Sequence, residues 1–189
     1  MSSITTNELR VGMKVEVDRE PYLIILNEFV KPGKGNAFNR IKMKNMINGR
    51  VVERTYKSGE KLDLADIEEA HMRFLYKESD GAVFMDEKTF DQISISNVIL
   101  GNNIPWLMEE TVFQVVFYKG SVIEIIPPTF MEMVITETAP GVRGDTSGRV
   151  LKPATTETGA KIPVPIFIEE GDKIKVDTRT AEYVSRAST

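Results

Sequence analysis

The sequence predicts an all-β protein built from three small barrels in a row. Apolar and polar residues alternate with a period of two along much of the 189-residue chain, whereas helical periodicity is nearly absent. Thirteen glycines and nine prolines separate the short apolar runs, which is typical of small antiparallel barrels. We place the three barrels at residues 1–64, 65–127 and 128–189, because Pro127-Pro128 cannot continue a strand.

The first segment contains four clear strand signals. Alternation predicts strands over Val11–Asp18 and Pro21–Asn27, and a further pair over Phe38–Ile47 and Arg50–Tyr56. Asn48-Gly49 between the last two predicts a two-residue hairpin turn.

The other two segments show the same pattern. His71 alternates with apolar neighbours and is therefore predicted on a strand surface, whereas Trp106 is expected to pack inside. Short helical turns are expected only around 91–100 and 106–110. The further predicted strands cover residues 70–77, 82–85, 111–118, 121–126, 130–138, 160–169 and 173–177.

The composition excludes several classes of function. The chain has no cysteine, so disulfides, thiolate metal sites and cysteine nucleophiles are impossible, and His71 is its one histidine. Adjacent glutamates on a strand point to opposite faces, and no nucleophile with a nearby base is visible. Apolar runs fall short of the roughly 20 residues of a membrane helix, and the N-terminus lacks the pattern of a secretory signal. We therefore expect a cytoplasmic protein that is not an enzyme and holds no metal or cofactor.

The net charge of −4 hides an uneven distribution. Residues 1–64 carry a net +4, residues 65–126 a net −7 and residues 127–189 a net −1. Within Lys31–Arg54, seven basic residues stand against Glu53 alone. A basic end on an acidic body indicates a polyanion that is contacted locally. From charge alone, a solvated lysine-rich hairpin explains the pattern equally well.

The loop predicted at residues 31–37 has the most unusual local sequence. It runs Lys31-Pro32-Gly33-Lys34-Gly35-Asn36-Ala37 between two strands, and proline and glycine both favour a turn. This composition places Lys34 at an exposed tip between small neighbours. The loop lacks the glycine and lysine spacing of the phosphate-binding loops of nucleotide hydrolases, so we do not expect it to bind a nucleotide. A glycine turn with an incidental lysine is the plain alternative.

Two further segments are candidates for binding. Gly144-Asp145-Thr146 and Lys152-Pro153-Ala154-Thr155 form polar loop sequences of the kind in which small barrels place contacts, although each also fits an ordinary turn. The C-terminal run could present Arg179, Tyr183 and Arg186 to RNA, or it could be a closing strand with solvated charges.

Together these features resemble bacterial elongation factor P across essentially the whole chain. The resemblance is carried by Glu28-Phe29-Val30-Lys31-Pro32-Gly33-Lys34-Gly35, Gly144-Asp145-Thr146, Lys152-Pro153-Ala154-Thr155, Thr158-Gly159-Ala160, Gly171, Ile174-Lys175-Val176-Asp177-Thr178-Arg179 and Glu182-Tyr183-Val184-Ser185-Arg186.

This resemblance implies both a fold and a function. The fold would be an SH3-like (KOW-type) domain followed by two OB-type domains, with an elongated, tRNA-like shape. The protein would enter the 70S ribosome between the peptidyl-tRNA and exit sites and help peptide bonds form at consecutive prolines. The implied partners are ribosomal RNA and proteins near the exit site, peptidyl-tRNA, and a lysine-modifying enzyme that resembles lysyl-tRNA synthetase. No membrane is involved, and a monomer is expected.

The resemblance also implies roles for individual residues. Lys34 matches a loop-tip lysine that carries a β-lysyl group, sometimes hydroxylated, and Lys31, Pro32, Gly33 and Gly35 surround it beside the tRNA acceptor end. Gly144, Asp145 and Thr146 match a loop that faces the exit-site codon. Tyr183 and Arg186 match residues near the small subunit and tRNA. In the basic first domain, Arg40 and Lys42 are our candidates for RNA-backbone contacts.

The chain departs from the family pattern at three places. Ser147–Leu151, including Arg149, differs from the usual glycine-rich stretch, and Thr156 stands where leucine is usual. We expect both to alter the codon-facing loop. Ala181 stands where glycine is usual, which predicts a different turn type there. The alternative function is a general single-stranded RNA-binding protein, which would need aromatic stacking platforms on a basic face.

Overall fold

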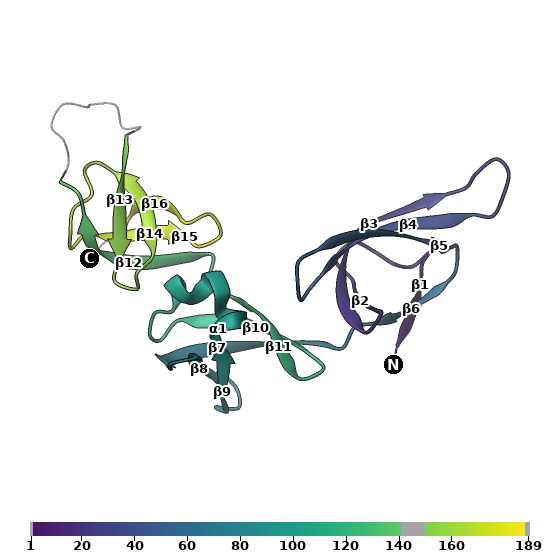
Figure 1. The fold of residues 1–189 in the computed structure, drawn as a ribbon, viewed down its shortest axis with the longest axis horizontal. Coiled ribbons are helices and arrows are strands. Elements are labelled where there is room, and N and C mark those ends of the chain that lie inside the picture. Colours follow the sequence, from purple (N-terminus) through teal and green to yellow (C-terminus); the bar gives the residue numbers. More distant parts are fainter. Residues whose placement is uncertain (1, 141–149, 188–189) are drawn as a thin grey trace. The chain divides into compact units, whose positions relative to one another are not determined.

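The structure is a computed structural model that describes residues 2–140 and 150–187. These residues form three antiparallel sheets and two short helical turns, so the predicted all-β class is confirmed (Figure 1). Within this described part of the chain, no helix is long and apolar enough to cross a membrane.

The first sheet has six strands in the order β1-β6-β2-β3-β4-β5. Strand β3 is the longest strand of this sheet, and the loop that joins it to β4 projects beyond the sheet (Figure 1). The strands are β1 (Ser3–Thr5), β2 (Lys14–Val17), β3 (Glu20–Val30), β4 (Phe38–Asn45), β5 (Val51–Lys57) and β6 (Lys61–Leu64).

One face of this sheet builds the first core. Along β4, Asn39, Ile41, Met43 and Asn45 are buried while the residues between them are exposed, as the period-2 pattern requires. The core cluster contains Leu9, Val15, Val17, Tyr22, Ile24, Ile41, Met43 and Leu62.

The turn between β4 and β5 differs from the sequence prediction. Asn45 N–H donates to Arg50 O at 2.8 Å, so four residues form the loop instead of the predicted two. The Asn45 side chain is the reason, because its Oδ1 accepts hydrogen bonds from the N–H groups of Ile47 and Asn48. Gly49 still takes a positive φ of 74° at the end of this loop.

The second sheet has five strands in the order β11-β10-β7-β8-β9. The helical turns occupy residues 97–106. The expectation of helix at residues 91–96 was wrong, because Gln92–Ser96 pairs with β8 instead. The expectation of helix at residues 107–110 was wrong as well, because the 3₁₀ turn ends at Trp106. The elements are β7 (Ile67–Lys77), β8 (Gly81–Asp86), β9 (Gln92–Ser96), the helical turn α1 (Asn97–Leu100), the 3₁₀ turn η1 (Gly101–Trp106), β10 (Val112–Tyr118) and β11 (Ser121–Ile126).

Aromatic rings organise the second core. Phe84 lies between Phe74 and Phe113, with ring centroids 5.6 Å apart in both pairs. Trp106 is buried and His71 is exposed, as predicted.

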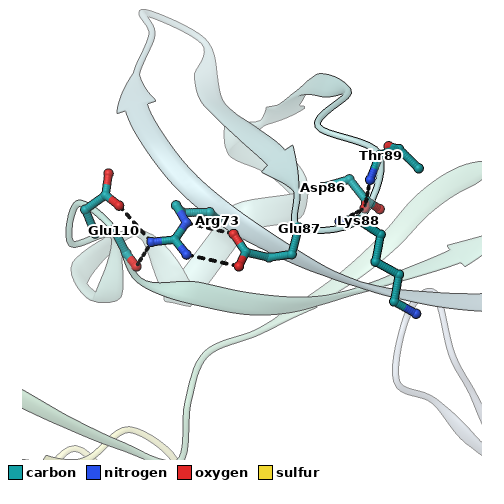
Figure 2. Close-up of polar contacts among 6 residues, drawn as sticks. All are labelled: Arg73, Asp86, Glu87, Lys88, Thr89 and Glu110. Atoms are coloured by element: carbon teal, nitrogen blue, oxygen red, sulfur yellow. Dashed lines mark hydrogen bonds and ion pairs between the residues drawn. The ribbon is translucent and has the colours of Figure 1, made fainter.

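A salt-bridge cluster joins β7 to the residue that follows β8 and to the turn that precedes β10 (Figure 2). The Arg73 guanidinium donates to both carboxylate oxygens of Glu87, at 2.7 and 3.0 Å, and to Glu110 Oε2 at 2.7 Å. The hydrogen bonds from Arg73 hold the pKa of Glu87 below its ordinary value of 4.5. Beside it, Asp86 Oδ1 accepts the backbone N–H groups of Lys88 and Thr89 at the β8–β9 turn.

The third sheet has the order β14-β13-β12-β15-β16. Its edge strands β14 and β16 also approach each other, which curls the sheet into a barrel. The predicted strand at 160–169 is shorter than expected, because the chain turns after Pro165. The strands are β12 (Phe130–Thr138), β13 (Leu151–Thr156), β14 (Lys161–Pro165), β15 (Lys173–Asp177) and β16 (Glu182–Arg186).

By compactness the chain divides into two units. One contains Met1–Glu69 with Val115–Glu124, and the other contains Ala70–Gln114 with Ile125–Thr189. Within the first unit, the Tyr118 hydroxyl donates to Glu16 Oε2 at 2.6 Å, and Lys119 Nζ pairs with the same oxygen at 2.8 Å. This ion pair lowers the pKa of Glu16 and fixes the β10–β11 turn on the first sheet.

Candidate functional site

The loop that carries Lys34 spans residues 31–37, as predicted. Strand β3 ends at Val30 and β4 begins at Phe38, and these two residues pair across the hairpin. Lys34 is exposed at the centre of the loop, and none of the ion pairs found among the described residues involves it. Its ammonium group is therefore free to meet a partner.

Glycine gives this loop its backbone path. Gly35 has φ of 114°, a conformation that other residues rarely adopt. Gly33 has nothing within 4 Å of the position that a Cβ would take, so the loop is open on that side. On the β4 side, Ser58 N–H donates to Ala37 O at 3.1 Å and fixes the base of the loop.

The outward face of β4 carries a row of basic side chains. Arg40, Lys42 and Lys44 are exposed in alternation with the buried residues of that strand. Arg40 lies between two carboxylates, with its Nη1 3.6 Å from Glu28 Oε2 and its Nε 3.6 Å from Glu53 Oε1. The outward face of β4 is thus positively charged, but the charge of Arg40 is partly neutralised by Glu28 and Glu53.

Sequence reasoning missed two asparagines behind this loop, of which Asn39 is buried and Asn27 is half-buried. The Asn39 Nδ2 group donates to Asn27 Oδ1 at 2.9 Å, and Asn39 is only 2% exposed. A signal for Asn39 was available, because the alternation of β4 puts it on the same face as Ile41 and Met43. A polar residue at a core-facing position indicates a specific hydrogen-bonded arrangement.

The structure shows Arg186 in contacts within its own domain. Its Nη2 donates to Phe167 O and to Asp172 Oδ2, each at 2.9 Å, and its guanidinium lies 5.2 Å from the centroid of the Phe167 ring. The pKa of Asp172 is lowered, first by the backbone N–H of Glu169 and then by Arg186. Arg179 is similarly held by Asp177, and Tyr183 is half-buried on β16.

The remaining predicted site residues are placed only in part. Gly144, Asp145 and Thr146 lie outside the described residues, as does Arg149, whereas Leu151 begins β13. The prediction of a loop at Lys152-Pro153-Ala154-Thr155 was wrong, because these residues belong to β13 and pair with β14, with Lys152 and Ala154 buried.

Two departures from the family pattern can be located. Thr156 is buried at the far end of β13, where its Oγ1 accepts the N–H of Ala160, so its place is the β13–β14 turn and not the loop that we expected it to alter. Ala181 has φ of 56°, the left-handed conformation that glycine favours.

No metal centre is found in the described part of the chain. There, no group of three or more histidine, cysteine, aspartate or glutamate side chains is gathered closely enough to hold an ion.

Comparison with known protein families accounts for nearly the whole chain. Residues 5–62 match the family model described as "Elongation factor P (EF-P) KOW-like domain", residues 67–125 match "Elongation factor P (EF-P) OB domain", and residues 131–186 match "Elongation factor P, C-terminal". The chain belongs to the elongation factor P family. The expected succession of a KOW-type domain and two OB-type domains is thereby confirmed.

Full-length relatives agree with this assignment. The chain is 65% identical to "Elongation factor P 2" of Protochlamydia amoebophila and 59% identical to "Elongation factor P 2" of Chlamydia caviae, over the full length of each protein. As a member of the elongation factor P family, this chain is a translation elongation factor and not an enzyme.

Solved structures show a similar fold at lower sequence identity. The eukaryotic translation initiation factor 5A from Methanococcus jannaschii matches with a TM-score of 0.53 at 21% identity, over 66% of this chain and 96% of that one. An initiation factor 5A family protein from Naegleria fowleri matches with a TM-score of 0.55 at 14% identity, over 66% and 97%. These two matches support the fold alone.

Proposed function

We propose that this elongation factor binds the ribosome between the peptidyl-tRNA and exit sites and accelerates peptide-bond formation at consecutive prolines. The observation that carries the proposal is the exposed Lys34 at the centre of the loop that projects beyond the first sheet. An ammonium group on such a loop can reach a substrate that the barrel itself cannot approach. We infer that Lys34 reaches beside the terminal nucleotides of the peptidyl-tRNA.

Positioning supplies the rate increase in this proposal. Proline reacts slowly because its amine is secondary and its ring restricts the approach geometry. A factor without catalytic side chains can still lower the barrier, since orientation of the reacting groups contributes several kcal/mol. Lys34 would hold the peptidyl end in a reactive pose, and the ribosome would carry out the chemistry.

The charge distribution supports contact with RNA at the first domain. Residues 1–64 carry a net +4, and the basic row on β4 includes Lys42 without an ion pair among the described residues. We propose that Arg40 and Lys42 contact the tRNA backbone, with Arg40 exchanging its carboxylate partners for phosphate. The net −7 of residues 65–126 would limit indiscriminate RNA binding.

Contacts of the last domain complete the proposed ribosome complex. We assign Gly144, Asp145 and Thr146 to the exit-site codon, and Tyr183 and Arg186 to the small subunit and tRNA. To bind RNA, Arg186 would have to leave Asp172, whereas Tyr183 is half-buried and partly accessible as it stands. The domain limits at residues 64 and 127, the monomeric state and the cytoplasmic location stay predictions.

We further propose that Lys34 is modified by an enzyme resembling lysyl-tRNA synthetase. Lys34 Nζ would attack the carboxyl carbon of an activated β-lysine, so that an amide bond forms, the activating group leaves and Nζ releases a proton. The added chain lengthens the arm and brings a second amine. The open surroundings of Gly33 leave room for such an enzyme at the loop. Hydroxylation of the modified side chain remains a prediction.

A reconstituted translation system tests the role of Lys34. Lys34→Ala should abolish the acceleration on a message with three consecutive proline codons and have no effect on a message without them. Lys34→Arg keeps the positive charge but cannot accept the β-lysyl group, so it should retain only the activity of the unmodified protein. Lys61→Ala, another exposed lysine of the first sheet, is the matched control and should behave as wild type.

Two results would overturn the proposal. One is full acceleration by Lys34→Ala. The other is tight binding of free RNA oligomers, unchanged by Lys34→Ala and without acceleration on the proline message, which would favour a general RNA-binding protein. Mass spectrometry of the natively produced protein should show a β-lysyl addition on the peptide that contains Lys34.

A further inference from the structure

Two asparagine side chains, Asn39 buried and Asn27 half-buried, form a polar joint between the β3–β4 hairpin and the N-terminal segment of the first barrel. Ile24, Ile41 and Met43 are fully buried, and Asn27 and Asn39 come next toward the tip. Phe29, which pairs with Asn39 across the hairpin, is 56% exposed, so the core no longer covers the β3 side of the hairpin at this level. The two carboxamides are therefore the polar side chains nearest the Lys34 loop on the inward face of the hairpin.

Both carboxamides bind the same turn of the N-terminal segment. Asn27 Nδ2 donates to Thr6 O and Leu9 O, each at 2.8 Å, and Asn39 Nδ2 donates to Thr6 O at 3.3 Å as well as to Asn27 Oδ1. These bonds connect both strands of the hairpin to one turn at Thr6–Leu9, which we call the anchor.

The anchor itself is firmly held. Thr6 Oγ1 donates to Lys57 O at 3.2 Å and accepts Gly59 N–H at 3.0 Å, and Thr6 N–H donates to Glu60 O at 2.8 Å. Thr6 is fully buried. The hairpin is thus connected through Thr6 to the β5–β6 turn, whose Ser58 also holds Ala37 at the base of the Lys34 loop.

This joint is not the arrangement that stability alone would favour. Asn39 Oδ1 is buried and has no hydrogen-bond partner in the described part of the chain. An unpaired buried acceptor costs about 1–3 kcal/mol. The hydrogen bonds of the two carboxamides are directional. They therefore select one orientation of the hairpin relative to the barrel, where apolar side chains would permit several.

A small rotation of the hairpin at Asn27 and Asn39 produces a larger displacement of Lys34, because Lys34 lies at the far end of the hairpin. Lys34 lies five residues from Asn39, so its reach from the joint is at most roughly 16 Å, the length of five fully extended residues. A rotation of about 5° at the joint would then move the tip by up to about 1 Å, and misplacement of that size can cost about a hundredfold in rate.

We propose that Asn27 and Asn39 are positioning residues, which hold the hairpin at the angle that presents Lys34 to its target. This inference rests on the proposed function of Lys34. The two asparagines do not touch the substrate. They act through Lys34 by keeping its loop in one orientation relative to the barrel.

Asn45 supplies a matched control for this proposal. It is buried on the same strand and makes hydrogen bonds with its side chain to Glu20, Ile47 and Asn48, but it lies at the opposite end of β4. Asn45→Ala should reduce stability much as Asn39→Ala does, without moving the Lys34 loop.

The test measures the proline-message rate as a function of factor concentration. Asn27→Ala and Asn39→Ala should lower the rate at saturation about tenfold, leave the half-saturating concentration within about twofold of wild type, and leave Lys34 modification unchanged. Asn45→Ala should match wild type in all three. Asn27→Ser, which retains one donor, should recover part of the saturating rate.

A measurement on the wild-type protein makes the proposal testable even where a variant fails to fold. Backbone order parameters should be near 0.85 for residues 28–30 and 38–40, and values below about 0.6 would overturn the proposal. Saturating rates for Asn27→Ala and Asn39→Ala equal to that of Asn45→Ala would also overturn it. If Lys34→Ala is fully active, the proposed function itself fails, and the two failures are thus distinguished.

Discussion

At the scale of single residues, Arg40 shows how the neighbours of a side chain decide what it can bind. It was chosen as an RNA contact because it stands in a basic stretch, and the alternation of β4 does direct it outward. Glu28 and Glu53 come from the two flanking strands, so cross-strand pairing alone brings them to it. Exposed ion pairs of this kind contribute about 0.2–1 kcal/mol, and phosphate can therefore replace them at little cost.

Ala181 gives a prediction at the same scale. Its φ of 56° is costly for any residue with a Cβ, so Ala181→Gly should raise the free energy of unfolding by about 0.5–1 kcal/mol after the entropy cost of glycine. Chemical denaturation measures the change. Ala70→Gly is the control, because Ala70 is half-buried in β7 without a positive φ and should lose stability. A loss in both variants would contradict the argument.

At the scale of elements, strands were easier to predict from the sequence than turns. The strands at 130–138 and 173–177 begin and end where alternation predicted, because one face of each is buried and the period is then visible in the sequence. The Asn48-Gly49 turn was predicted too short because Asn45, outside the dipeptide, determines the loop through its side chain. A local motif cannot reveal such a partner.

The candidate site likewise has one part that the local sequence predicts and another that depends on distant residues. The Lys34 loop could be found because its ends, its glycines and its lysine are all local features of the sequence. The joint at Asn27 could not, since its hydrogen bonds reach Thr6 and Leu9, which lie far away along the chain. Likewise, the engagement of Arg186 with Asp172 depends on how β16 packs and not on its own sequence.

The pairing of β8 with β9 gives a prediction at the element scale. A Cβ on Gly81 would collide with the backbone carbonyl of Ile95, which cannot move without breaking the pair. Gly81→Ala should therefore lower the free energy of unfolding by about 1–3 kcal/mol. Gly33→Ala, where no atom lies within 4 Å of the new Cβ, should leave stability nearly unchanged. Urea unfolding compares the two, and equal stabilities would refute the clash.

At the scale of the whole molecule, ion pairs recur in each of the three sheets. Glu16, Glu87 and Asp177 all have a pKa below the ordinary value, in each case first through hydrogen bonds from a basic partner, namely Lys119, Arg73 and Arg179. A carboxylate with a lowered pKa in the folded state stabilises the fold above its unfolded pKa. That contribution is lost as the pH falls through the folded value.

We therefore expect the unfolding temperature to stay constant near neutral pH and to fall below about pH 4.5, where the same carboxylates begin to take up protons in the unfolded chain. Thermal unfolding monitored by circular dichroism from pH 7 to pH 3 measures this. Glu87→Gln removes one such group and should make the decline shallower. An unfolding temperature that rises on acidification would contradict the sign.

The loop at residues 31–37 lies outside the barrel core, so its length can change without a change in the residues that keep the barrel folded. Both ends of the segment 31–37 leave from a single pair of bonded strands, so the cost of lengthening the segment grows only slowly with its length. Residues added in pairs to the two strands would preserve which side chains face inward. Loops of different length and sequence could therefore be carried by the same barrel.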